Sequence, residues 1–260
     1  MFRFTASDGV SLAYEQWGQE NGGTPVLLCH GYGINTQINW VIPGVVKALV
    51  AAGRHVVALD ARGHGESDKP HDSRFYGEER MALDVSELMD TLSVSQVDLV
   101  GYSMGSIVAL IVASREPRVR RLIVGGIGES AVILGGIDSR MLPFEAIVEA
   151  MLAEDSSTIQ HPAVQAIRAF VDMCGADRLA LAAQARMFHA TPITLKSITA
   201  PTLVIVGDQD PLAQRPEVLV DAIVNARLAI KNGDHTRVAN DPTFTPTLVG
   251  FLSQELEPTP

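Results

Sequence analysis

The chain has 260 residues, of which 47% are hydrophobic and 19% charged, and its formal net charge is −10. This composition is typical of a globular protein with a large core, in one large domain or two small ones, and it excludes an intrinsically disordered chain. The negative charge disfavours nucleic acid as a partner, because it repels phosphate groups unless a local basic patch is present. The basic cluster from Arg115 to Arg121 surrounds Pro117 between apolar segments and is interpreted as a solvated turn.

Segments of strand length and helix length alternate through the first half of the chain. Two leading strands, at 2–5 and 12–17, are separated by Asp8-Gly9, which predicts an antiparallel hairpin at one edge of a sheet. The segments that follow are predicted as strands at 25–30, 55–60, 97–101 and 121–125 and as helices at 42–52, 79–92 and 104–114. Strands that alternate with helices indicate a parallel sheet whose two faces are covered by crossover helices.

The alternation is interrupted from Glu129 to about Ala176. This stretch is rich in Leu, Ile, Ala and Met at helical spacing and contains no clear strand. Alternation then resumes with helices at 179–188, 216–223 and 242–256 and strands at 202–206 and 227–230. The sequence therefore predicts an α/β fold with a mostly parallel eight-stranded sheet and helices on both faces. Its core comprises residues 1–128 and 177–260, and residues 129–176 form a small helical cap, or lid, inserted in that core.

The pentapeptide Gly101-Tyr102-Ser103-Met104-Gly105 falls between a predicted strand and a predicted helix. A serine on such a sharp turn, a nucleophile elbow, projects its hydroxyl from the sheet edge, and the flanking glycines leave room for the turn. The pattern alone is also compatible with an ordinary helix start in which Ser103 is the N-cap. The other candidate residues decide between these two interpretations.

An acid and a base are candidates at the ends of two later strands. Asp210 follows the strand 202–206 directly, and His235 follows the strand 227–230 after a short turn. The carboxyl ends of parallel strands lie at one edge of a sheet, where ligands bind in open α/β folds, so both side chains are expected near Ser103. His235 would accept the proton of Ser103 and deliver it to the leaving group, and Asp210 would orient and stabilise the imidazole.

With serine, acid and histidine in that chain order, the sequence resembles the α/β-hydrolase superfamily over nearly its whole length. In that family the acid commonly lies in a Gly-x-x-Asp turn, which favours Asp210 over Asp208 as the third member of a catalytic triad. A second position for the acid in the family is the end of the preceding core strand, which makes Glu129 the reserve acid. The family commonly has a Gly-His pair, whereas here Asp234 precedes His235.

The resemblance also implies an oxyanion hole. In the family a His-Gly-x segment, here His30-Gly31-Tyr32, supplies one backbone donor, so the resemblance implies the amides of Tyr32 and Met104 as the two donors. The side chain of His30 is expected to brace this loop. The segment that contains His64 is structural in the family and has no third ligand at a metal-like spacing. No glycine-rich phosphate loop is present either, so we expect no metal, nucleotide or flavin cofactor.

The type of nucleophile narrows the reaction without fixing it. Family members that use aspartate, the haloalkane dehalogenases and epoxide hydrolases, are set aside because position 103 is serine. A serine suits hydrolysis of a carboxylic ester or lactone through an acyl-enzyme, hydrolysis of a carbon–carbon bond in a diketone, or peroxyacid formation by a perhydrolase. A non-catalytic, ligand-binding relative of the family is the rival from another class, and the complete set of Ser103, Asp210 and His235 argues against it.

The predicted lid favours a small, uncharged and largely apolar substrate. Its candidate lining residues are aliphatic, aromatic or thioether side chains: Ile133, Leu134, Ile137, Met141, Leu142, Phe144 and Met151. Such residues would form an apolar pocket over the strand ends.

Cysteine use and the N-terminal sequence bear on where the protein works. Cys29 and Cys174 lie in separate segments, so we expect no disulfide and a reducing compartment. The N-terminal residues lack an apolar stretch of signal-peptide length, and no run approaches the roughly 18 apolar residues of a membrane span. The expectation is a cytoplasmic protein that binds a small-molecule substrate and neither membrane nor nucleic acid, while the sequence leaves its oligomeric state open.

Overall fold

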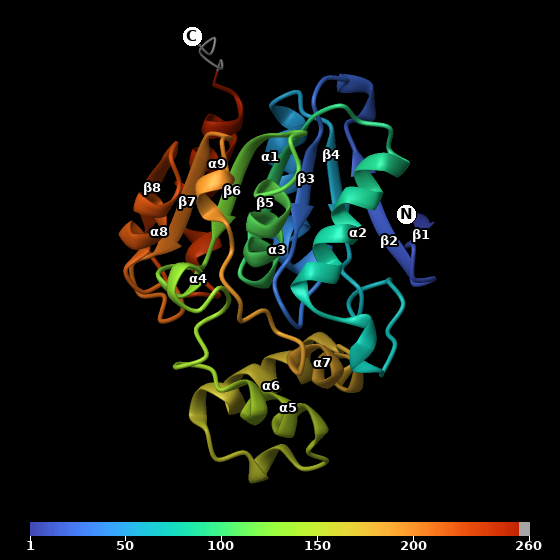
Figure 1. Ribbon diagram of the computed structural model, residues 1–260, viewed down its shortest axis with the longest axis vertical. Helices are drawn as coiled ribbons and strands as arrows, with labels where there is room; N and C mark the ends of the chain where they lie inside the picture. Colours follow the sequence, from blue (N-terminus) through green and yellow to red (C-terminus); the bar gives the residue numbers. More distant parts are fainter. Residues whose placement is uncertain (255–260) are drawn as a thin grey trace.

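The computed structural model describes residues 1–254 and contains an eight-stranded sheet in the order β1-β2-β4-β3-β5-β6-β7-β8 (Figure 1). The strands are β1 (Phe2–Thr5), β2 (Ser11–Trp17), β3 (Val26–Cys29), β4 (Val56–Leu59), β5 (Val97–Tyr102), β6 (Val119–Gly125), β7 (Thr202–Gly207) and β8 (Ala226–Lys231). The β1–β2 hairpin is antiparallel and joins the sheet through antiparallel pairing of β2 with β4, while the other neighbouring pairs are parallel. The predicted fold class is confirmed.

Helices cover both faces of the sheet. They are α1 (Val45–Ala51), α2 (Glu78–Thr91), α3 (Met104–Ala113), α4 (Ser130–Ile133), α5 (Phe144–Leu152), α6 (Pro162–Cys174), α7 (Arg178–Ala185), α8 (Pro216–Ala222) and α9 (Phe244–Leu252). Within residues 1–254, none of these helices has the length and apolar content needed to cross a bilayer. The predicted final helix extends to residue 256, and its last two positions lie outside the described residues.

Alternate residues of the central strands separate the core into two apolar clusters. Leu27 and Cys29 of β3 pack in the cluster that includes α2, α3 and α8, whereas Val26 and Leu28 pack in the cluster that includes α1 and α9. Successive side chains of a strand point to opposite faces, so a strand covered on both faces is apolar throughout. This explains why β3 appears in the sequence as a continuous apolar run.

The predicted helix 42–52 begins three residues later than expected. The preceding segment, Gln37–Val41, forms a single turn of π-helix, and α1 starts only at Val45. Pro43 has no N–H to donate, and Gly44 has a φ of 86°, so the two residues break the helix between these segments. The π-helical turn thereby becomes a separate element beside the loop that follows β3.

Helices α5, α6 and α7 form a cap beyond one end of the sheet, and α4 stays with α8 at the sheet (Figure 1). α7 packs against α5, although the sequence analysis placed its residues in the core that resumes at 177. Four of the six buried residues of α7 are alanines, among them Ala180 and Ala183, and such small side chains let neighbouring helices approach closely. Helical spacing identifies such a buried face but not the element that covers it.

The interpretation of the basic cluster as a solvated turn is wrong for its last member. Arg121 is only 2% exposed because β6 begins at Val119 and carries this side chain into the protein. It lies 3.9 Å from the buried carboxylate of Asp98, which also accepts hydrogen bonds from Arg54 and Arg120. These arginines therefore neutralise the charge of a buried aspartate. Asp98 lies at the start of β5, away from the carboxyl ends of the strands that carry the candidate site.

Candidate functional site

Ser103 occupies a strained turn between β5 and α3. Its backbone has φ 54° and ψ −119°, a region that non-glycine residues rarely adopt and that costs about 1–3 kcal/mol. The glycines on either side permit close packing, since a Cβ at Gly105 would lie 2.1 Å from the carbonyl oxygen of Cys29 and one at Gly101 would lie 2.2 Å from that of Gly105. The geometry is that of the predicted elbow.

Three side chains from separate strand ends form one hydrogen-bonded chain. His235 Nε2 lies 3.0 Å from Ser103 Oγ, and His235 Nδ1 lies 2.8 Å from Asp210 Oδ2. Asp210 is 4% exposed, and its second oxygen accepts the amide of Leu212. The carboxylate oxygen of Asp210 can only accept, so His235 carries a proton on Nδ1 and donates it to this oxygen. The lone pair of Nε2 then faces the serine hydroxyl.

The two other candidate acids are engaged elsewhere. Glu129 Oε1 and Oε2 accept hydrogen bonds from Arg140 and Arg215 at 2.8 and 2.9 Å, so its carboxylate is paired without His235. Asp208 accepts the amide of Gly233 and fixes the turn between β8 and His235. The structure therefore brings Asp210, and not the reserve acid, to the imidazole.

The loop after β3 leaves one backbone amide available near Ser103. The Gly31 amide donates to Asn39 Oδ1 at 2.9 Å and the Gly33 amide to His64 Nε2 at 3.0 Å. The amide between them, that of Tyr32, has no acceptor among residues 1–254. The amide of Met104, the first residue of α3, is likewise without an acceptor in this part of the chain, as expected at a helix N-terminus.

Two buried histidines hold this loop in their neutral form. His30 Nε2 accepts the Ala61 amide and its Nδ1 donates to the Gly31 carbonyl. His64 Nε2 accepts the Gly33 amide, so its Nδ1 donates to the Arg62 carbonyl. Burial lowers the pKa of His30, and burial together with the nearby His30 lowers the pKa of His64 to about 3. Neither ring is positioned for proton transfer to Ser103.

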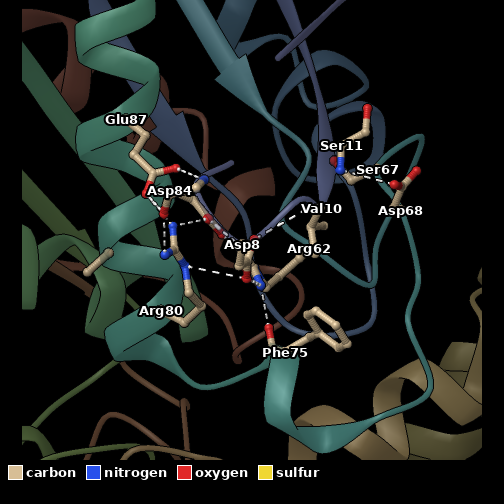
Figure 2. Close-up of polar contacts among 12 residues, drawn as sticks. Asp8, Val10, Ser11, Arg62, Ser67, Asp68, Phe75, Arg80, Asp84 and Glu87 are labelled. Atoms are coloured by element: carbon tan, nitrogen blue, oxygen red, sulfur yellow. Dashed lines mark hydrogen bonds and ion pairs between the residues drawn. The ribbon is translucent and has the colours of Figure 1, made fainter. Parts of the chain in front are cut away.

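A buried ion-pair network anchors the segment that carries His64 (Figure 2). The Arg62 guanidinium is completely buried and donates to Asp84 on α2, to Asp8 in the β1–β2 turn and to the Phe75 carbonyl. Burial alone would disfavour its charge, but the hydrogen bonds that Arg62 donates to Asp84 and Asp8 outweigh that effect and raise the pKa of Arg62. Because the Arg62 carbonyl accepts from His64, the network reaches the loop after β3 through two hydrogen bonds.

Helix α7 touches the side chains of both residues that carry the available amides. The Tyr32 hydroxyl donates to the Leu181 carbonyl at 2.9 Å, and the buried Gln184 amide donates to the Met104 sulfur. Gln184 was not predicted as a site residue, because a single glutamine in an alanine-rich helix gives no functional signal. Only the fold shows that α7 lies against the elbow.

A cavity of about 280 Å³ lies over Ser103 and His235. Its core side includes the loop after β3, the π-helical turn, Tyr102 before the elbow, Leu212 after β7, residues that follow His235 and the first residue of α9. The cap contributes Ile137, Leu142, Ile147, Ile167, Phe170 and Val171, with Phe188 from the segment that follows α7. Of the predicted lid-lining residues, Ile137 and Leu142 are therefore in the lining, and Met151 is fully buried elsewhere.

The lining is apolar and uncharged. None of the described residues that line the cavity is Lys, Arg, Asp or Glu. Within residues 1–254, no group of three or more His, Cys, Asp or Glu side chains is arranged to hold a metal ion. The lining residues with polar side chains are Ser103, His235, Asn39, Thr236, Tyr32 and Tyr102.

Known proteins with related sequences and folds include several enzymes. A family model described as the alpha/beta hydrolase fold matches residues 24–133. The non-heme chloroperoxidase CPO-A1 of Kitasatospora aureofaciens is 28% identical, over 96% of this chain and 98% of that protein. The 2-hydroxymuconate semialdehyde hydrolase of Pseudomonas sp. strain CF600 is 28% identical, over 89% of this chain and 88% of that protein. The crystal structure of the enol-lactonase from Burkholderia xenovorans LB400 superposes with a TM-score of 0.79 at 25% identity, covering 97% of this chain and 100% of that one.

Proposed function

The chain belongs to the α/β-hydrolase superfamily, and from that premise we propose that it is a serine hydrolase acting on a small, largely apolar carboxylic ester or lactone through an acyl-enzyme. The observation that carries this proposal is the hydrogen-bonded chain of Ser103, His235 and Asp210 at the floor of an uncharged apolar cavity.

The proposed mechanism follows from the positions of the hydrogen-bonding atoms. His235 Nε2 accepts the Ser103 proton as Oγ attacks the substrate carbonyl, and Asp210 stabilises the imidazolium that forms. The amides of Tyr32 and Met104 donate to the oxyanion, and each such donor contributes about 3–4 kcal/mol in enzymes where one was removed. His235 then protonates the leaving group, and in a second half-reaction it activates the water that releases the acyl group.

The substrate class is inferred from the lining of the cavity. A carboxylate moved into such a lining would lose its hydration without gaining a cationic partner, which is costly. The cavity volume of about 280 Å³ lies near the lower end of the range for small-molecule pockets. An uncharged ester or lactone of modest size therefore suits the site better than an anionic or polymeric substrate.

Two alternatives use the same three side chains. Carbon–carbon bond hydrolysis is represented among the relatives by the 2-hydroxymuconate semialdehyde hydrolase, whose substrate is named as a muconate derivative, and the uncharged lining here does not favour such an acid. A perhydrolase would open the acyl-enzyme with hydrogen peroxide in place of water. Because some relatives are named chloroperoxidase or haloperoxidase, peroxide-dependent activity is also assayed. A protein that only binds ligands would show neither reaction.

The proposal is tested by hydrolysis of p-nitrophenyl acetate and butyrate by the wild type and by Ser103→Ala. We expect turnover by the wild type and loss of at least three orders of magnitude in the variant, roughly as for other serine hydrolases. A panel of short esters, lactones and vinylogous diketones, with and without peroxide, then separates the reactions. Undiminished hydrolysis in Ser103→Ala would exclude a serine-nucleophile mechanism.

A further inference from the structure

Asn39 lines the cavity with a side chain whose hydrogen-bonding capacity the protein uses only in part. It belongs to the π-helical turn Gln37–Val41, a backbone form that occurs frequently at functional sites. Its neighbour Ile38 also lines the cavity, and Trp40 on the same turn is buried in the core. The turn thus presents one amide side chain and one aliphatic side chain to a bound molecule.

The orientation of the Asn39 amide follows from its contact with the loop after β3. The Gly31 N–H lies 2.9 Å from the side chain and can only donate, so the atom that faces it must be the oxygen. The NH₂ group is therefore directed elsewhere, and no acceptor in residues 1–254 bonds to it. Asn39 thus retains two N–H donors in the cavity that Ser103 and His235 also line.

The other polar side chains of the lining are engaged. The hydroxyls of Tyr32 and Tyr102 donate to backbone carbonyls, and that of Thr236 donates to a neighbouring aspartate. Ser103 and His235 bond to each other. Among the lining residues described, the Asn39 NH₂ group is the side-chain donor that a substrate oxygen can take without breaking a contact of the protein.

We propose that Asn39 determines specificity by donating from Nδ2 to a second oxygen in the acyl part of the substrate. The leaving group must lie against His235 to receive its proton, whereas Asn39 is attached to the loop that carries the Tyr32 amide. The preferred substrates are then uncharged esters or lactones whose acyl part carries a keto, ether or ester oxygen. This inference rests on the proposed serine-hydrolase function.

An acyl chain without such an oxygen would leave the NH₂ group unpaired once the substrate displaces water. An unpaired polar group in an apolar cavity is penalised, whereas a paired one gains only a modest net free energy. Discrimination therefore arises mainly from the loss suffered by the plain acyl chain, as in sites built to bond a polar substrate group.

The test is a thermodynamic cycle in which the Asn39 side chain and one oxygen of the substrate are each removed, separately and together. The value of kcat/KM for p-nitrophenyl pentanoate is compared with the values for p-nitrophenyl 3-methoxypropanoate and p-nitrophenyl ethoxyacetate, in which an ether oxygen replaces one methylene. The ether-to-pentanoate ratio of the wild type is divided by the ratio of each variant, so that intrinsic ester reactivity cancels. Asn39→Leu removes both the acceptor for the Gly31 amide and the donors, while Asn39→Asp, assayed at a series of pH values up to one at which its carboxyl is ionised, keeps the acceptor and removes the donors.

We expect at least one ether ester to give a ratio about 3- to 10-fold higher in the wild type than in both variants, the magnitude of one neutral hydrogen bond. Gln37→Ala, on the same turn but outside the cavity lining, should keep the wild-type ratio, and thermal unfolding confirms that each variant folds. Equal ratios in the wild type and both variants for both ether esters would overturn the inference and leave Asn39 only the role of holding Gly31. Absence of ester hydrolysis, or hydrolysis that survives Ser103→Ala, would instead refute the proposed function, and the inference would fall with it.

Discussion

Glu78, the first residue of α2, is a buried acid whose ionisation should weaken the fold. It is 1% exposed, and its carboxylate accepts the His189 amide at 2.7 Å. The His189 carbonyl in turn lies 1.9 Å from the position of a Cβ at Gly136, so the segments that enter and leave the cap run side by side at this point. The neighbouring Glu79 is paired with Arg115, and no cation among residues 1–254 bonds to Glu78.

The magnitude follows from the pKa of this carboxyl. Burial raises the pKa of Glu78 from 4.5 to about 7, although the hydrogen bond from His189 acts in the opposite direction. Each tenfold change in proton affinity corresponds to about 1.4 kcal/mol, so the displacement is worth about 3 kcal/mol. Between these pH values the folded protein holds a proton that the unfolded chain has released. The free energy of unfolding therefore falls as the pH rises from 4.5 to about 7 and loses nothing further from this group at higher pH.

Glu78→Gln keeps an oxygen for the His189 amide and carries no charge at any pH. Its free energy of unfolding, relative to the wild type, should rise by about 3 kcal/mol between pH 4.5 and pH 8, which corresponds to roughly 6–12 °C in Tm for a chain of this size. Urea unfolding at several pH values, followed by tryptophan fluorescence, measures the difference. Glu79→Gln is the matched control, because Arg115 lowers the pKa of the neighbouring carboxyl and the control should lose a little stability at high pH. A difference between Glu78→Gln and the wild type that stays constant with pH would refute the reasoning.

Three further substitutions probe the acid, the buried ion pairs and the elbow. Asp210→Asn should lower kcat on p-nitrophenyl butyrate by roughly 10³–10⁴-fold, since the imidazole loses its preferred tautomer. Glu129→Gln should retain activity within about tenfold, and comparable losses in the two variants would contradict the assignment of the acid. Arg62→Met should lower the free energy of unfolding by about 1.5–3 kcal/mol, because the buried carboxylate of Asp84 loses a charged hydrogen-bond donor and keeps only Arg80, and a loss below about 1 kcal/mol in urea unfolding would show that the network is dispensable. Gly105→Ala should abolish hydrolysis or folding, because its Cβ would lie 2.1 Å from a carbonyl oxygen of β3, while Gly250→Ala in α9 meets no atom within 4 Å and should leave hydrolysis and folding intact. An active, stable Gly105→Ala would show that the elbow is less tightly packed than described.

The sheet could be predicted from the sequence because its strands are short apolar runs with turn residues at their ends. The same pattern brings Ser103, Asp210 and His235 to one edge, since each follows a parallel strand, and the structure shows them in hydrogen-bond contact. The glycine pattern around Ser103 also carries a steric requirement that is visible in the sequence. These features depend on local chemistry and on the polarity of the strands.

Features that depend on tertiary packing could not be predicted. The π-helical turn that presents Asn39 follows from its position against the loop after β3, and an asparagine among mixed polar and apolar residues gives no signal of it. The placement of α7 against α5 is a choice between covering elements that helical periodicity does not encode. The burial of Arg121 was missed because its partner Asp98 lies on the adjacent strand, far from it in the sequence.

The claim that Ser103 is the nucleophile is tested most directly by labelling with a fluorophosphonate probe, followed by intact-mass measurement and peptide mapping. The account predicts one adduct per chain, located on Ser103, that is absent in Ser103→Ala and forms much more slowly in His235→Ala, because the hydroxyl then lacks its base. A native protein that the probe leaves unlabelled, or one labelled equally well in Ser103→Ala, would contradict it.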